Sequence, residues 1–410
     1  MRRLDFEYRR IRKLSLPTIA LKAALKLLGV GVWFALLPVT ALLHVAGYRR
    51  VTIFTDRIGH LAIEPDCLLK EQALGKIPAR KWILLAPGPR VANAHLLKYW
   101  EPHFVVLRNR AACFFAASMS QFALMRHDVS HYVRAIGGTQ AAFRIYRDWS
   151  KRPPLLQLTR DDIEYGNASL EALGLPQHAW FVCVHAREAG FSPVDEELHR
   201  HRNSDIDNTI PAIKEIVRRG GWAIRMGDPS MKSLHPMEHV IDIAHHRLKS
   251  DRLDIVLCAR ARFILGNTSG IALAGTVFGV PCALANMVPM TAMGMAATDI
   301  SIPKRYWSNR ESRCLRLNEA LSLRLAGMQH AVSFDESGIR LEENSPDEIR
   351  ELVVEMLDRL AGVSVEDETD RKLQEQAGAL LADGHYSFGA ASRMGARFLR
   401  RHLAAKRNTP

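Results

Sequence analysis

Short strand-like runs alternate with helical spacing through the first half of this 410-residue chain. β-Branched and aromatic runs stand at residues 51–54, 81–86 and 104–107. Apolar residues recur at helical spacing over 62–73 and 93–100. Strands that alternate with helices are typical of parallel α/β sheets. We therefore predict a first Rossmann-like domain over residues 51–150.

The same alternation returns after a connector predicted over residues 151–178, in which Thr159 is expected to cap a helix. The second half is expected to contain strands at 180–184, 222–226, 262–265 and 281–284, and helices at 210–217 and 271–278. We predict a second Rossmann-like domain over residues 179–345. Three helices, at 346–361, 367–382 and 389–404, make up a region over 346–410 that we expect to cross back and brace the first domain.

An uninterrupted apolar segment precedes both domains. Residues 27–46 contain no acid, lysine or arginine, and about 20 such residues can cross a bilayer as one helix. Pro38 lies inside the segment, where it removes a helix hydrogen bond, so we expect a kink there. Basic residues flank the segment on both sides. We predict a membrane-associated unit over residues 1–50 that spans, dips into or lies on a membrane; the alternative is a buried helix of the first domain.

The net charge of +13 is concentrated at the two ends of the chain. Residues 1–13 hold six cations against two acids, and residues 391–410 hold six cations and no acid. A nucleic-acid-binding body would carry a basic stripe with interleaved aromatic residues, and none is present, so we expect no nucleic-acid partner. Basic ends suit an anionic membrane surface. The alternative is two solvated tails without a partner.

The cysteines do not form a metal-binding pattern. None belongs to a Cys-x-x-Cys pair, and most lie in apolar runs, which favours buried free thiols over a zinc site or a disulfide framework. The chain also lacks the GxGxxG and P-loop spacings. We therefore predict neither a metal nor a cofactor.

The first candidate site follows the predicted strand at 262–265. It consists of small and hydroxyl residues: Gly266, Asn267, Thr268, Ser269 and Gly270. Ligands of open α/β sheets bind at the carboxyl ends of strands, and glycines let backbone N–H groups approach a phosphate. The alternative is an ordinary helix cap with glycine turns.

Two more candidate sites follow neighbouring strands of the same domain. His185 and Arg187 come directly after residues 180–184, and Arg187 can pair bidentately with a diphosphate. Arg225 ends the strand at 222–226 and precedes Gly227 and Asp228. A pair of arginines on a diphosphate leaving group stabilises the charge that develops on it. The alternatives are a loop ion pair between Arg187 and Glu188 and a surface arginine beside a glycine turn.

Hydrogen-bonding residues also enter the predicted helix at 210–217. Arg202, Asn203 and Asp205 suit sugar hydroxyls, and we treat them as substrate-binding. Capping of the helix by Asp205 or Asp207 is the alternative. These two aspartates have the spacing of a metal-binding Asp-x-Asp pair, but they fall at a helix start and not at a strand end.

The first domain offers the candidates for proton transfer. Arg57 and Gly59 are predicted to bind substrate, and Asp56, His60 and Glu64 are candidate general bases. The sequence does not rank these three. A plain loop is the alternative.

The order of these motifs resembles a bacterial family of inferred glycosyltransferases with the two-lobed GT-B fold. The resemblance rests on the runs that begin at His185, Arg202, Ile224 and Gly266, with further likeness at Arg57–His60, Phe278–Pro281, Asn286 and residues 345–349. The family is distantly similar to fucosyltransferases with a strand-end His-x-Arg, which invert the anomeric centre and require no metal. The resemblance implies that Arg187 and Arg225 hold the donor diphosphate and that Ser269 binds it as well.

The resemblance implies an enzyme of bacterial surface-polysaccharide synthesis. It would move a hexose or fucose-like sugar from a nucleotide-diphosphate donor to a glycan or lipid-linked acceptor, without a metal. The body would lie on the cytoplasmic side of the inner membrane. Two alternatives remain at this point: a non-catalytic membrane-bound scaffold of a polysaccharide-assembly complex, and another nucleotide-using enzyme such as an epimerase.

Overall fold

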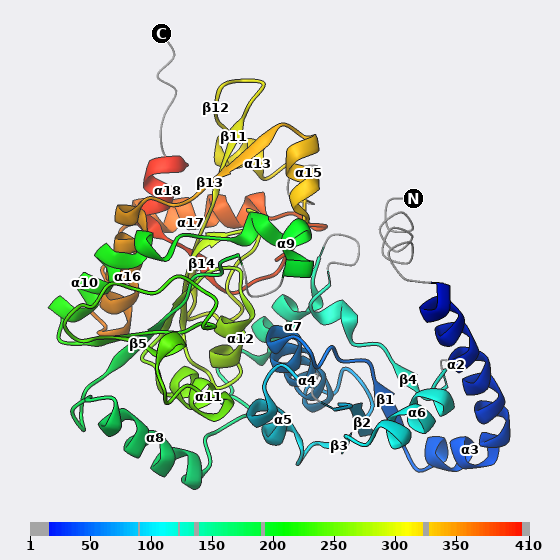
Figure 1. The fold of residues 1–410 in the computed structure, drawn as a ribbon. Helices are drawn as coiled ribbons and strands as arrows, with labels where there is room; N and C mark the ends of the chain where they lie inside the picture. Colours follow the sequence, from blue (N-terminus) through cyan, green and yellow to red (C-terminus); the bar gives the residue numbers. More distant parts are fainter. Residues whose placement is uncertain are drawn as a thin grey trace.

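The chain forms two α/β lobes, each built on a parallel sheet (Figure 1). The structure is a computed structural model that describes residues 16–88, 91–121, 124–134, 139–189, 193–322 and 328–403. The predicted α/β fold class with two parallel-sheet units is confirmed. Several of the apolar runs became buried strands: all four residues of Phe181–Val184, for example, are buried. The run at 51–54 was misplaced, since the first strand covers Tyr48–Val51.

The first lobe has a four-stranded sheet in the order β3-β2-β1-β4, with all neighbours parallel. Its strands are β1 (Tyr48–Val51), β2 (Lys81–Leu85), β3 (Phe104–Leu107) and β4 (Arg126–His127). Its helices are α4 (Ile58–Ala73), α5 (Ala94–Trp100), α6 (Arg110–Met119) and α7 (Ala141–Trp149). The chain builds outward from β1 through β2 to β3 and then returns to the other side with β4. The direction of winding therefore changes between β1 and β4.

The second lobe has a seven-stranded parallel sheet in the order β14-β10-β9-β8-β5-β6-β7. Its strands are β5 (Phe181–Val184), β6 (Trp222–Arg225), β7 (Val240–Asp242), β8 (Ile264–Gly266), β9 (Cys282–Met287), β10 (Ile300–Pro303) and β14 (Arg393–Met394). The helices that accompany them are α8 (Arg160–Ala172), α9 (Pro193–His199), α10 (Ile210–Arg218), α11 (Asp251–Arg260) and α12 (Gly270–Thr276). The six strands β5 to β10 follow the doubly wound order, with the change of direction between β5 and β8.

The C-terminal region differs from prediction in two respects. Between β10 and α16 (Pro346–Leu360), the chain forms a small antiparallel sheet that the sequence did not predict. Its strands are β11 (Arg305–Ser308), β12 (Arg313–Cys314) and β13 (Ile339–Glu342). The short helices α13 (Leu317–Ala320) and α15 (Ala331–Glu336) lie between β12 and β13 in the chain. The last helix, α18 (Ala396–His402), is shorter than the predicted 389–404, because residues 393–394 pair with β10 instead. α17 (Glu368–Leu380) precedes them.

The N-terminal apolar segment forms two helices, α2 (Leu16–Ala35) and α3 (Leu37–Val45), bent by 68°. The break falls at Leu36 and not at Pro38. Pro38 lies in the first turn of α3, where a backbone N–H has no partner within the helix, so the proline costs no helix hydrogen bond there. Among the described residues, no single helix is long and apolar enough to cross a membrane, whereas this bent pair passes the same test together. The basic residues 1–13 lie outside the described part, as do residues 404–410.

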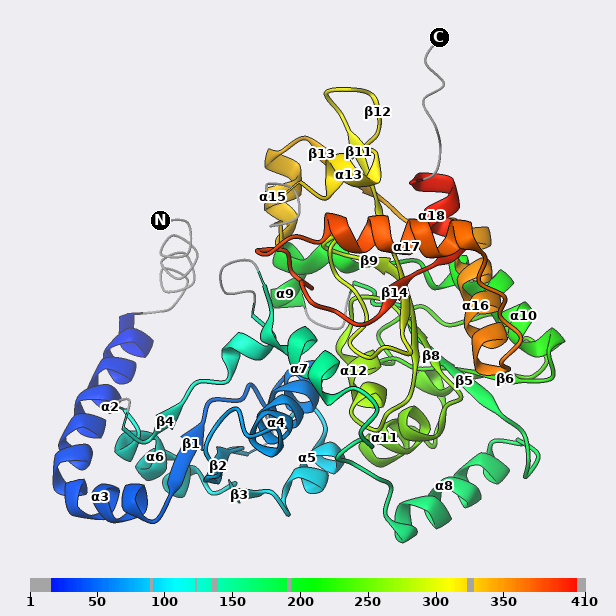
Figure 2. The same ribbon diagram turned by 180° about the vertical axis from the view of Figure 1, so that it is seen from behind.

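The lobes contact each other at several places. α4 and α12 lie side by side in both views (Figures 1 and 2). A segment between α17 and β14 runs along the first lobe: the Tyr386 carbonyl accepts a 3.0 Å bond from the Gln140 amide. Asp162 on α8 accepts hydrogen bonds from His95 of the first lobe at 2.9 Å and from Arg252 of α11 at 2.7 Å. The expected bracing is thus present, but the loop before β14 makes this contact rather than a helix.

Candidate functional site

Each sheet has one point where its winding changes direction, and these points locate the candidate site. In open α/β sheets, ligands bind outside the carboxyl ends of the strands at such a point. In the second lobe it lies between β5 and β8, whose ends carry His185 and the Gly266–Gly270 loop. In the first lobe it lies between β1 and β4, and His60 stands in the first turn of α4, which follows β1.

His185 is held by hydrogen bonds at both ring nitrogens. Nδ1 lies 3.0 Å from the Met226 carbonyl, which can only accept, so Nδ1 carries the proton. Nε2 therefore accepts from the Ser269 hydroxyl at 2.9 Å. Burial lowers the pKa of His185 to about 4, helped by the positive charges of Arg225 and Arg187. His185 is thus a neutral residue that orients Ser269, and both lie at the point between β5 and β8.

Arg187 lies at the same point and is partly accessible, with 16% of its side chain exposed. Its guanidinium donates to the Asn203 side-chain carbonyl and lies 3.6 Å from Glu196 on α9. Its backbone N–H donates to Asn267 at 3.2 Å. The Arg187 side chain is therefore positioned by neighbours and still reaches the surface of the site.

Asn267 ties the loops around Arg187 together. It is buried, and its amide nitrogen donates to the Arg202 carbonyl and to the Ser204 hydroxyl, both at 3.1 Å. Its neighbour Thr268 accepts a 2.9 Å bond from the Val288 amide. The predicted 266–270 loop thus contacts segments that follow other strands of the sheet. Its residues Ser269 and Gly270 are half-exposed and lie next to the first lobe.

Arg225 is placed differently from the prediction. The sequence suggested that it grips the diphosphate, but its side chain is fully buried, 3.7 Å from Glu188 and 3.5 Å from Asp242. It also donates to the Lys232 carbonyl at 2.7 Å. Arg225 faces inward because two carboxylates from other elements neutralise it there. Glu188, expected as a partner of Arg187, belongs to this buried group instead.

Gly227 and Asp228 form the turn that follows Arg225. A Cβ on Gly227 would lie 2.9 Å from the Arg225 guanidinium, so a side chain there would displace it. Asp228 accepts a 3.0 Å bond from the Ser230 amide, which closes the turn. Both residues shape the support of the site.

The 202–205 segment contributes one residue directly to the site, Asn203, through its contact with Arg187. Arg202 contributes its carbonyl to Asn267. Asp205 caps the short turn Ile206–Thr209 by accepting from the Asp207 amide at 3.1 Å, and its carboxylate also lies 3.3 Å from the Lys232 ammonium. Asp205 thus caps the turn that precedes α10 and not α10 itself, which has no side-chain cap.

Lys304 was not identified from the sequence. It follows β10 and is almost completely buried, and its ammonium donates to the Asn203 carbonyl. Burial lowers its pKa, and Glu343 at 3.9 Å opposes that shift. Because Arg187 and Lys304 both contact Asn203, two cations converge on one point. The signal in the sequence was a lysine directly after the strand-like run Ile-Ser-Ile-Pro, which places it at the carboxyl end of a strand.

In the first lobe, the structure pairs two of the three candidate bases. His60 Nδ1 lies 2.8 Å from Glu64 Oε1, one helical turn away on α4. Glu64 is fully buried and also accepts from the Phe54 amide at 3.2 Å. Burial raises the pKa of Glu64, and the contact with His60 opposes that shift. Asp56 is exposed, and Arg57 is the exposed residue that precedes α4.

Two glycines bring the two halves of the site together. A Cβ on Gly270 would lie 2.7 Å from the Gly59 amide nitrogen, and one on Gly59 would lie 3.0 Å from the Gly270 Cα. Consecutive Cα atoms are 3.8 Å apart, so the Cα atoms of His60 and Ser269 are at most about 12 Å apart. His60 and Ser269, candidates from different lobes, therefore lie near each other.

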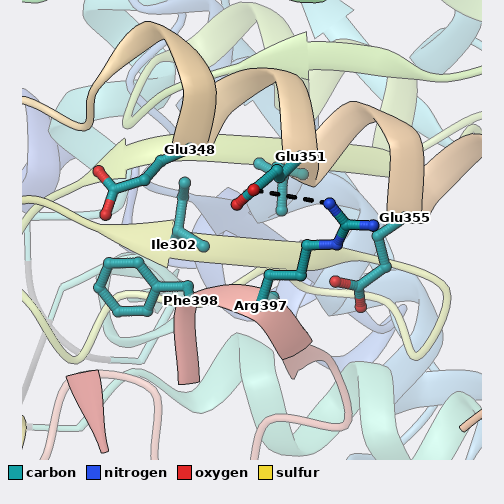
Figure 3. Close-up of a pocket in the computed structure, with 8 residues that line it drawn as sticks. Ile302, Glu348, Glu351, Glu355, Arg397 and Phe398 are labelled. Carbon is teal, nitrogen blue, oxygen red and sulfur yellow. Dashed lines mark ion pairs between the residues drawn. The ribbon is translucent and has the colours of Figure 1, made fainter. Parts of the chain in front are cut away.

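Two surface hollows lie elsewhere, among the C-terminal helices. The smaller, about 10 Å³ between α16 and α18, holds no more than one water molecule and contains a Glu351–Arg397 ion pair at 3.5 Å (Figure 3). The larger, about 450 Å³, is lined by Arg393, Arg397 and Arg400, each of which pairs with a carboxylate, as Arg400 does with Asp370 at 2.7 Å. Within the described residues, no three His, Cys, Asp or Glu side chains form a group that could hold a metal.

The chain matches no protein-family model, and no curated protein matches its sequence. Several solved structures resemble it. The glycosyl transferase family 9 protein from Veillonella parvula DSM 2008 is 12% identical with a TM-score of 0.37, covering 58% of this chain and 80% of its own. The E. coli ADP-heptose LPS heptosyltransferase II is 14% identical with a TM-score of 0.35, covering 63% and 90%.

The third structure is TibC, an iron-containing dodecameric glycosyltransferase from enterotoxigenic E. coli H10407. It is 10% identical with a TM-score of 0.32, covering 58% of each chain. All three structures are of glycosyltransferases, and the likeness to them is one of fold.

The two arginines should respond differently to substitution. Arg225→Met leaves Glu188 and Asp242 without their buried partner, which we expect to lower the free energy of unfolding by about 3–5 kcal/mol. Arg187→Met, at a partly exposed site, should lower it by less than about 1.5 kcal/mol. Urea unfolding of both variants, with Arg160→Met on the exposed face of α8 as control, measures the difference. Equal losses would contradict the distinction.

His185 should make stability depend on pH. Its pKa is about 4 in the folded protein, below the ordinary histidine value, so the unfolded chain binds more protons between about pH 6.5 and 4. Stability should therefore fall by about 3 kcal/mol as the pH falls through this range. His185→Gln should lose this component in urea unfolding at a series of pH values. Ser269→Ala should retain it, because burial is the main cause; loss of the component in both variants would refute this.

Proposed function

We propose that this protein is a glycosyltransferase that moves a sugar from a nucleotide-diphosphate donor to a glycan or lipid-linked acceptor. One observation carries the proposal: the points where the two sheets change winding direction meet at Gly59 and Gly270. A cationic site and a histidine–carboxylate pair thereby border the same space from opposite lobes. A transfer between two bound molecules needs this arrangement, because donor and acceptor must be held with their reacting atoms adjacent.

The second lobe supplies the donor side. Arg187 and Lys304 converge at Asn203, and two cations match the charge of a diphosphate. Ser269, oriented by His185, offers a hydroxyl beside them. During transfer the bond between the sugar and the diphosphate breaks, and negative charge grows on the departing diphosphate. Fixed cations stabilise that charge more in the transition state than in the bound donor, which lowers the barrier.

The first lobe supplies the base. Because His60 Nδ1–H donates to Glu64, its Nε2 is left as the acceptor for a proton. The acceptor hydroxyl gives its proton to Nε2, and its oxygen forms the new bond to the anomeric carbon. The buried Glu64 carboxylate stabilises the imidazolium that results. Among the three candidate bases, the structure therefore favours His60 with Glu64 as its positioning residue.

The finer features of the proposal follow from this arrangement. A base opposite the leaving group supports a single displacement, which inverts the anomeric centre. The cations Arg187 and Lys304 fill the role that a divalent ion has in other transferases, which supports metal-independent transfer. We further propose a hexosyl or fucosyl donor, and a place in bacterial surface-polysaccharide synthesis on the cytoplasmic face of the inner membrane, where nucleotide-sugars are made.

Nucleotide binding tests the donor side. Full-length protein in detergent should bind one nucleoside diphosphate of a guanosine, uridine, cytidine and adenosine panel in calorimetry, with and without EDTA. Arg187→Ala should weaken that binding by roughly 10- to 100-fold, because a charge-assisted contact is lost. Arg160→Ala is the matched control and should bind as the wild type does. A folded protein that binds none of the four would favour the scaffold alternative.

Turnover tests the acceptor side. His60→Ala should lower the rate of nucleotide release from the donor–acceptor pair by about 10²- to 10⁴-fold, the usual contribution of a general base, with donor affinity unchanged. Glu64→Gln should lower it less, through loss of orientation and charge. Asp56→Asn is the matched control, an exposed carboxylate nearby that should leave the rate unchanged. A large loss in Asp56→Asn with an active His60→Ala would transfer the role to Asp56.

A further inference from the structure

The helices α2 and α3 carry an apolar surface at the outer edge of the first lobe, on the side away from the second lobe (Figures 1 and 2). More than half of the strongly exposed large hydrophobic side chains in the described chain belong to them: Leu21, Leu25, Leu27, Leu28, Phe34, Leu37, Val39, Leu42 and Val45. Soluble surfaces rarely gather such a set, and a patch of this kind marks an interaction site.

The exposed residues of α2 occupy one half of its circumference. At 100° per residue, Leu21, Leu25, Leu27, Leu28 and Phe34 fall within one arc of about 180°. Lys26 falls on the opposite face by the same spacing. The strongly exposed large apolar side chains of α2 therefore lie on one side of the helix, away from the first lobe.

The other half of α2 is fixed to the first lobe. Gly29 is buried, and a Cβ there would lie 2.3 Å from the Gln121 amide nitrogen and 3.2 Å from the Ser118 hydroxyl. α3 is fixed as well: Thr40 is buried, and His44 Nδ1 lies 3.0 Å from the Leu124 carbonyl. A helix that crossed a bilayer would have to leave these contacts. The packing therefore favours helices that lie in a surface plane.

Cations surround the point where α3 meets the first sheet. The β1–β2 register places Lys81 opposite Tyr48, and the Lys81 amide donates to the Gly47 carbonyl at 3.0 Å. Arg80 and Arg49 lie close enough that Arg80, after burial, lowers the pKa of Arg49. Burial lowers the pKa of Arg50 as well, and the positive charge of Arg126 adds to that shift. Among the described residues, no acid forms an ion pair with any of these five cations.

We propose that the α2–α3 pair binds an anionic phospholipid surface, with its apolar half in the headgroup–acyl boundary and the cations at the amino end of the first sheet on the lipid phosphates. The residues from Leu14 to Thr55 include no acid, which suits a negative surface. Apolar burial in the headgroup–acyl boundary and attraction to anionic lipids add to each other in binding of this kind. The proposal is independent of the sugar transfer proposed above.

Vesicle flotation tests the proposal. Detergent-free full-length protein is mixed with vesicles of phosphatidylcholine alone or with 30% phosphatidylglycerol, at about 0.1 M and 0.5 M salt. Wild-type protein should float with the anionic vesicles at least tenfold more than with neutral ones, and added salt should reduce the difference, because screening weakens charge attraction. Equal flotation with both vesicle types would overturn the role of the cations.

Two variants separate the apolar and the charged parts. Leu27→Asp with Leu42→Asp should lower flotation at least tenfold on either vesicle, whereas Arg80→Glu with Lys81→Glu should remove only the preference for anionic lipid. Val363→Asp with Val365→Asp is the matched control, since these valines are 64% and 89% exposed in the C-terminal region. Circular dichroism checks that each variant is folded.

A second copy of the chain is the competing occupant of this surface. If wild-type protein does not float, and sedimentation shows a dimer that Leu27→Asp with Leu42→Asp converts to a monomer, the surface is a protein interface and the lipid proposal is wrong. Flotation by the folded aspartate variant at the wild-type level would also overturn it.

Discussion

The contact between Gly59 and Gly270 is the constraint on which the candidate site depends. Backbone meets backbone there, and any side chain at either position would push the lobes apart. The residues on both sides of this contact are the ones with chemistry: His60 follows Gly59, and Ser269 precedes Gly270. The spacing between the proposed base and the proposed donor site is therefore set by two residues that have no side chain.

The two arginines near the proposed donor site are held in different surroundings. Arg225 is fully buried, yet Glu188, Asp242 and a backbone carbonyl surround it. Its positive charge contributes to keeping His185 neutral, and neutral His185 in turn holds Ser269. Arg187 contacts the amide of Asn203 and lies 3.6 Å from Glu196. The two arginines differ in exposure: the Arg225 side chain is fully buried, whereas 16% of the Arg187 side chain is exposed.

The sequence predicted strands such as β2, β5, β6 and β8 because their apolar runs are long enough to be recognised, but it missed the short strands β4, β7 and β14. It misplaced Arg225, because the carboxylates that draw it inward come from distant elements. It began the first-lobe helix at residue 62, whereas α4 begins at Ile58 without a side-chain cap to signal it. With the true start, His60 and Glu64 are four residues apart on one helix, and their pairing follows. Lys304 was missed because β10 is short and ends in proline.

The bond between Gln140 and Tyr386 has a mechanical consequence. Together with the Asp162 hub and the glycine contact, it joins the lobes at three separate places along their boundary. Lobes joined in this way are already assembled before a substrate arrives. For the sugar transfer proposed above, less of the free energy of substrate binding would then be consumed by domain closure, which is the advantage of a preorganised site.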